Sequence, residues 1–169
     1  MIKRTLLLLS VIIVVAASLF VVFLVVEKIV LKRSARQRME SVSNFELFDL
    51  DSSRISFAPG RKTLLVYFDS DCDHRENEIN DIGRNIKIFQ EFDIVLVSSE
   101  HINAIASFEN VHSVLLRSAE VRFGKINVDH AYETFGSLNV PQIFIYGRDG
   151  NLIKKFTGET SAAVLQQYL

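Results

Sequence analysis

The stretch that decides the fold is residues 62–79, which read Lys-Thr-Leu-Leu-Val-Tyr-Phe-Asp-Ser-Asp-Cys-Asp-His-Arg-Glu-Asn-Glu-Ile. Its first seven residues form a short, nearly continuous apolar run, typical of a central strand that is covered on both faces. After Cys72, apolar residues recur at helical spacing, namely Ile79, Ile82, Ile86 and Phe89. The stretch therefore predicts a buried strand, a loop that contains Cys72 and an amphipathic helix.

The rest of the chain continues this alternation of strands and helices. Residues 92–97 form a second apolar run, and a strand, helix, strand order predicts a parallel pair. Further strands are predicted at 44–50, 123–128, 142–146 and 152–156, and helices at 101–108, 129–135 and 160–169. The segment Gly147-Arg-Asp-Gly150 between two of these strands is a strong hairpin signal. The pattern predicts an α/β fold that ends in an antiparallel hairpin.

The N-terminus carries a long uncharged run. Thr5 to Val26 is 22 residues without a charge. As a helix the run is about 33 Å long, enough to cross a hydrocarbon core of roughly 30 Å. A cleaved signal peptide is the alternative, but the apolar run continues beyond Ala17 and exceeds the usual ~7 to 15 residues. We predict an anchor within residues 1–26, a basic stalk over 27–43 and a domain over 44–169.

Charge limits the partners and gives a first indication of topology. The net charge of -1 provides no basic excess, which argues against nucleic acid as a partner. Two basic residues precede the apolar run and five follow it closely: Lys3 and Arg4, then Lys28, Lys32, Arg33, Arg36 and Arg38. Taken alone, the positive-inside rule places the domain in the cytoplasm.

Three pieces of the sequence, in this order, resemble the thioredoxin superfamily. Leu64–Ile79 looks like the strand, active-site loop and helix of membrane-tethered redoxins. Val140-Pro141 before residues 142–146 is similar to the family's proline, normally cis, and Gly147–Gly158 resembles its closing hairpin. The resemblance implies a thioredoxin-like fold, a central mixed sheet flanked by helices, here preceded by a single transmembrane helix. It also implies a thiol-disulfide oxidoreductase of the cell envelope, with its domain on the extracytoplasmic side.

The active-site loop departs from the family pattern. The motif reads Cys72-Asp-His-Arg75, so that Arg75 stands where the family has its second cysteine. A thioredoxin uses that second thiol to resolve the mixed disulfide formed by the first. Because Cys72 is the chain's one cysteine, no disulfide can form within the chain and resolution requires an external thiol.

The resemblance also assigns roles to individual residues. Cys72 is the catalytic thiol, at a helix N-terminus that favours a thiolate, whereas Asp69, Asp71 and Asp73 in the same loop favour the neutral thiol. Arg75 and His74 are supporting residues, and Val140 and Pro141 bind substrate. No cofactor is implied. The partners are the membrane and either protein thiols or an external reductant.

Several alternatives to monothiol exchange remain at this stage. A degenerate thioredoxin-like domain that binds a partner protein or peptide without turnover is the main one, and a buried, inert Cys72 would favour it. A one-cysteine peroxidase is discounted, because Leu65 and Asp69 stand where peroxiredoxins have Pro and Thr. A metal site is also discounted, since one cysteine and four scattered histidines are a poor ligand set: His74, His101, His112 and His130.

Overall fold

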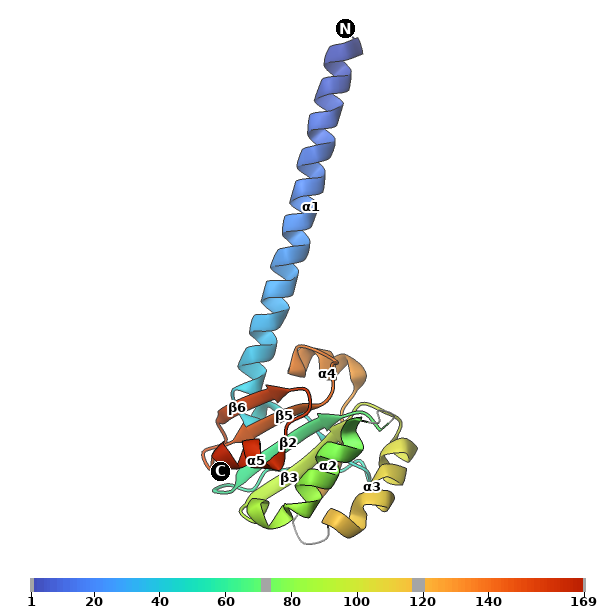
Figure 1. The fold of residues 1–169 in the computed structure, drawn as a ribbon. Coiled ribbons are helices and arrows are strands. Elements are labelled where there is room, and N and C mark those ends of the chain that lie inside the picture. The colour runs from blue at the N-terminus through green and yellow to red at the C-terminus, as the bar shows by residue number, and fades with distance from the viewer. Residues whose placement is uncertain (1, 71–73, 117–120, 169) are drawn as a thin grey trace.

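The computed structural model of the protein describes residues 2–70, 74–116 and 121–168, with side chains over 12–70, 79–112 and 121–168 (Figure 1). The helices are α1 (Ile2–Met39), α2 (His74–Arg84), α3 (Ile102–Leu116), α4 (Val128–Phe135) and α5 (Ala162–Leu165). The strands are β1 (Phe48–Asp49), β2 (Lys62–Phe68), β3 (Phe92–Ser98), β4 (Val121–Lys125), β5 (Gln142–Tyr146) and β6 (Leu152–Thr157). Short 3-10 helices lie at Val42–Asn44, Ile86–Phe89 and Gln166–Tyr168.

The strands form one mixed sheet in the order β1-β4-β3-β2-β5-β6. Strand β2 runs parallel to β3, and β3 runs parallel to β4. On the other side of β2, β5 is antiparallel to β2 and β6 is antiparallel to β5. The predicted parallel pair, the terminal hairpin and the order of elements after residue 62 are confirmed.

Helices cover both faces of this sheet, which explains why its central strands are apolar throughout. Alternate residues of β2 enter different core clusters: Leu64, Val66 and Phe68 face α2, α3 and α5, whereas Leu65 and Tyr67 face the opposite layer. That opposite layer includes the end of α1 and α4 (Figure 1), together with apolar residues of the segment between α1 and β2. A strand buried on both faces shows no alternation of polar and apolar residues, as the run at 62–68 predicts.

Helix α1 projects from the domain as one continuous helix of 38 residues, about 57 Å long (Figure 1). Within Ile12–Met39, the most apolar 18-residue stretch has a mean hydropathy of 2.6 and is not buried inside the structure. By length and composition, this helix could therefore span a membrane. Among the described residues it is the one helix that could. The predicted apolar helix is thus present.

The last turns of α1 are packed into the domain. Ala35 is 2% exposed and Met39 is 9% exposed, both within the core cluster that contains Phe135. Gly136, the C-cap of α4, permits this approach, because a Cβ there would lie 3.2 Å from the Cβ of Ala35. Part of the segment predicted as a stalk is therefore buried.

Backbone hydrogen bonds join the end of α1 to the terminal hairpin. The Leu152 N–H donates to the Glu40 carbonyl at 2.9 Å, and the Val42 N–H donates to Gly150 at 2.9 Å. The Tyr146 hydroxyl donates to the Met39 carbonyl at 3.1 Å. We infer that the folded unit starts in the last turns of α1, several residues before residue 44.

Candidate functional site

Three segments meet at one edge of the sheet. Because β2 and β3 are parallel, their carboxyl ends, Phe68 and Ser98, are paired there. Strand β5 is antiparallel to β2 and begins at the same edge, where Gln142 pairs with Tyr67. The loops that follow β2 and β3 and the loop that precedes β5 therefore share this edge.

The predicted catalytic residue belongs to the first of these loops. Cys72 lies outside the described residues, and in sequence it stands between Ser70 and the start of α2 at His74. His74 and Arg75 are in the first turn of α2, and their side chains are outside the described set. The predicted order of strand, cysteine loop and helix is thus confirmed for the backbone on both sides of Cys72.

Glu100 fixes the start of the Cys72 loop to the end of β3. The Ser70 hydroxyl donates to the Glu100 carboxylate at 2.8 Å, and the Ser70 backbone N–H donates to the same group. The Ser98 hydroxyl is a third donor, at 3.0 Å. Sequence analysis missed Glu100. The available signal was the run Ser98-Ser99-Glu100, polar residues placed directly after a buried parallel strand.

Tyr67, one residue before the end of β2, adds a neutral hydrogen-bonding group near this edge of the sheet. Its ring stacks on Phe135 with centroids 4.5 Å apart, and its hydroxyl lies 3.0 Å from the Ser99 hydroxyl. Burial raises the pKa of Tyr67, the Ser99 hydrogen bond opposes the rise, and the negative charges of Asp69 and Glu100 add to it. The carboxylates of Asp69 and Glu100 thus oppose formation of a further anion at this tyrosine.

The Val140-Pro141 peptide bond is cis, as the resemblance implies. The Pro141 carbonyl accepts a hydrogen bond from the Gly158 N–H at 2.9 Å, which links the loop to the chain after β6. The Gln142 side-chain amide donates to the carbonyls of Ser137 at 2.9 Å and Asn139 at 2.8 Å. These bonds hold the proline loop against β5, with Val140 partly exposed and Pro141 buried.

The described histidines are dispersed over the molecule. His112 is buried in α3, stacks on Phe108 and has its Nδ1 3.0 Å from the Phe108 carbonyl. His101 and His130 are exposed, one before α3 and one in α4. Within the part of the chain that the structure describes, no group of three or more His, Cys, Asp or Glu residues is arranged to hold a metal ion.

Comparison with known proteins gives matches at the level of structure. No protein-family model matches the chain, and no curated protein sequence matches it. Among solved structures, dsbF from MTB superposes with a TM-score of 0.62 at 17% identity, covering 78% of this chain and 93% of dsbF. A secreted Mycobacterium tuberculosis disulfide oxidoreductase homologous to E. coli DsbE gives 0.60 at 14% identity, covering 78% and 96%.

A third structure is the exposed lipoprotein thioredoxin Etrx1 of Streptococcus pneumoniae. It has a TM-score of 0.55 at 21% identity, covering 73% of this chain and 95% of the other. Identities this low establish the fold alone. The mixed sheet, the flanking helices and these superpositions together show that the chain has a thioredoxin-like fold, preceded by an apolar N-terminal helix.

Proposed function

We propose that this chain is a membrane-tethered thioredoxin-like protein that acts on thiols and disulfides through Cys72. The observation that carries the proposal is the shared sheet edge. In sequence Cys72 stands between β2 and α2, and the cis Val140-Pro141 peptide precedes β5, which pairs with β2 at this edge. Two of the proteins that are structurally similar to this chain are a secreted M. tuberculosis disulfide oxidoreductase and the exposed lipoprotein thioredoxin Etrx1.

The proposed chemistry is monothiol exchange. The Cys72 thiolate attacks one sulfur of a partner disulfide, so that the partner S–S bond breaks and its other sulfur leaves as a thiolate. An external thiolate then attacks the partner sulfur of the mixed disulfide, and Cys72 leaves as a thiolate. The partner sulfur ends bonded to the external thiol, and the protein is regenerated without net gain or loss of electrons.

For membrane attachment we propose that α1 spans the bilayer with the domain on the extracytoplasmic side. The exposed apolar surface of α1 supports insertion, and the secreted and exposed proteins among the structural neighbours support this side. The basic residues after the apolar run oppose it. A topology reporter fused after Leu169 tests on which side of the membrane the domain lies. A reporter that is active only in the cytoplasm would show that the proposed orientation is wrong.

The reactivity of Cys72 tests the proposed chemistry directly. The full chain in nonionic detergent is treated with an aromatic disulfide, and one equivalent of aromatic thiolate should be released per chain, with Cys72→Ser as the control. Without an added small thiol, insulin reduction should show no turnover, because nothing in the chain resolves the mixed disulfide. Arg75→Cys restores a dithiol and should give measurable turnover.

A binding-only domain is the competing function, and the absence of a second cysteine favours it. It predicts that Cys72 stays unmodified in the folded protein and that Arg75→Cys forms no internal disulfide. If both results are obtained, monothiol exchange is excluded.

A further inference from the structure

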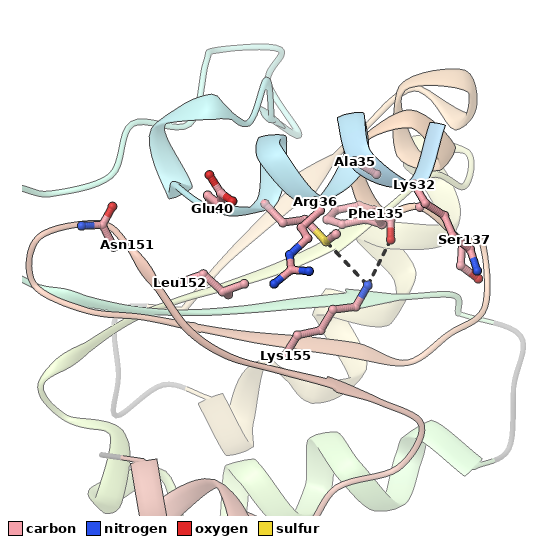
Figure 2. Close-up of a pocket in the computed structure, with 11 residues that line it drawn as sticks. Lys32, Ala35, Arg36, Glu40, Phe135, Ser137, Asn151, Leu152 and Lys155 are labelled. Atoms are coloured by element: carbon pink, nitrogen blue, oxygen red, sulfur yellow. Dashed lines mark hydrogen bonds between the residues drawn. The ribbon is translucent and has the colours of Figure 1, made fainter. Parts of the chain in front are cut away.

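A cavity of about 760 Å³ lies where α1 joins the domain. Its walls are the last turns of α1, the chain after α4 and strand β6. Figure 2 shows Arg36 extending into this space from α1 and Lys155 from β6, while Lys32 lies at the end nearest Ser137. The cavity is at the opposite end of α1 from the N-terminus, and none of the residues that line it belongs to the segment between β2 and α2.

The sequence of α1 places three of its basic residues on the same side as its buried residues. Lys28, Lys32 and Arg36 are spaced by four residues and so lie on one face of the helix. Ala35 and Met39 continue that face and are buried. A smaller cavity of about 220 Å³, lined by Lys28 and Lys32, adjoins the first through residues that both share.

Positive charge predominates in the larger cavity. It is lined by three cations, Lys32, Arg36 and Lys155, and by one carboxylate, Glu40. None of these three cations is in an ion pair with another described residue. The site therefore has the charge of an anion-binding site, with apolar side chains at its base.

Lys155 is the most enclosed of the three cations. Its ammonium donates to the Phe135 carbonyl at 3.0 Å, lies 3.6 Å from the Met39 sulfur and is 5.1 Å from the centre of the Phe144 ring. These are neutral partners, and burial lowers the pKa of Lys155. An anion in the cavity would offset the charge of this ammonium, which its present neighbours only partly satisfy.

The cavity is also at the right distance from a bilayer that contains α1. Lys32 is six residues beyond Val26 and Arg36 is ten residues beyond it. Measured along the helix axis, these residues are about 9 and 15 Å from the end of the apolar run. The headgroup layer extends roughly 5 to 8 Å beyond the hydrocarbon core, and its negative potential decays over a further ~8 to 10 Å. Lys32 therefore lies next to the headgroup layer, and Arg36 lies within the negative potential beyond it.

Helix α4 lies at the same end of the domain, beside the base of α1 (Figure 1). Tyr132 on this helix is 45% exposed, and Leu138 after it is 46% exposed. Tyrosine and apolar side chains are favourable at a membrane–water interface. This end of the domain thus combines the basic cavity with side chains suited to contact headgroups.

We propose that the cavity binds the phosphate of an anionic phospholipid headgroup in the leaflet from which α1 emerges. Arg36 and Lys155 contact the phosphate inside the cavity, and Lys32 contacts it at the rim. The site is independent of the reaction proposed for Cys72 and depends only on the proposed insertion of α1. Its failure leaves the thiol chemistry untouched.

Thermal unfolding of the full chain in nonionic micelles tests the proposal. Three probes are titrated separately: short-chain phosphatidylglycerol, short-chain phosphatidylcholine and inorganic phosphate. Saturating phosphatidylglycerol should raise the Tm by roughly 5 to 10 °C, and phosphatidylcholine should not. In Arg36→Gln the apparent affinity should fall at least tenfold, and Lys32→Gln should weaken binding in the same direction.

The matched control is Arg33→Gln, which removes the same charge from the same helix at an exposed position that does not line the cavity. It should respond like the unaltered protein. Equal responses in Arg33→Gln and Arg36→Gln would overturn the proposal, because attraction to a charged micelle would then explain the effect. A response to inorganic phosphate alone would overturn the assignment to lipid.

Discussion

Truncation of Met39 to alanine tests whether the last turns of α1 belong to the folded domain. The Met39 side chain is 9% exposed and packs in the cluster that contains Phe45, Phe135 and Tyr146. Removing a buried methionine to alanine costs about 2 to 5 kcal/mol, through lost burial and the cavity left behind. For a domain of this size that corresponds to a fall in Tm of roughly 6 to 20 °C.

The measurement is thermal or urea unfolding of the full chain in nonionic detergent, monitored through the secondary structure of the domain. Ile29→Ala is the matched control, since Ile29 is on the same helix and is 47% exposed. It should change stability by less than about 0.5 kcal/mol. A fragment that starts at residue 28 should also be more stable than one that starts at residue 44. If Met39→Ala unfolds like the control, α1 ends as a stalk outside the folded unit.

Three further predictions concern charged side chains. Replacing Glu100 by Gln removes a negative charge that the Ser70 hydroxyl contacts at the start of the Cys72 loop, and should raise the rate of Cys72 alkylation at neutral pH relative to the unaltered protein. Asp93→Asn should lower the free energy of unfolding, measured in urea, by about 1 to 3 kcal/mol. The loss should be smaller than for a fully buried ion pair, because the Arg61 side chain, 3.1 Å from Asp93, is 34% exposed. Burial lowers the pKa of Lys155, so the Lys155 ammonium loses its proton at a lower pH in the folded protein than in the unfolded chain. Between the lowered pKa and the usual 10.5 the unfolded chain binds more protons, so the free energy of unfolding should rise with pH in that range. Unfolding of Lys155→Met between pH 7 and 10.5 should lack that rise.

The central part of the fold could be predicted from the sequence because each signal there is local. The apolar runs of β2 and β3 are long enough to identify buried strands, and Gly136 ends α4 in a left-handed conformation with φ of 70°, as a helix C-cap requires. The predicted strand at 123–128 is wrong in its bounds. Asn127 caps α4 by accepting a hydrogen bond from the Asp129 N–H, which stops the strand at Lys125.

The ends of the domain were predicted less well, because tertiary contacts determine them. Residues 44–50 contribute a strand of only Phe48–Asp49, paired with β4 at the sheet edge. The basic, polar sequence around Ala35 and Met39 resembles a solvated linker, and its two buried residues become visible only once α4 and the hairpin are in place.

For the site, the sequence indicated the order of the loops but not the side chains that support them. The cis Val140-Pro141 bond was anticipated from the resemblance. Glu100 and Gln142 were not, because their roles depend on partners about thirty residues away in one case and on loop carbonyls in the other. The roles assigned to Cys72, His74 and Arg75 remain predictions.

The continuity of α1 with the domain limits where the protein can act. Met39 is thirteen residues beyond Val26, which is about 20 Å of helix with no break between the apolar run and the core. With α1 inserted as we propose, the domain has no joint at its base and is held at one height and one tilt above the lipid. Partners must therefore present their sulfur atoms at that height above the membrane.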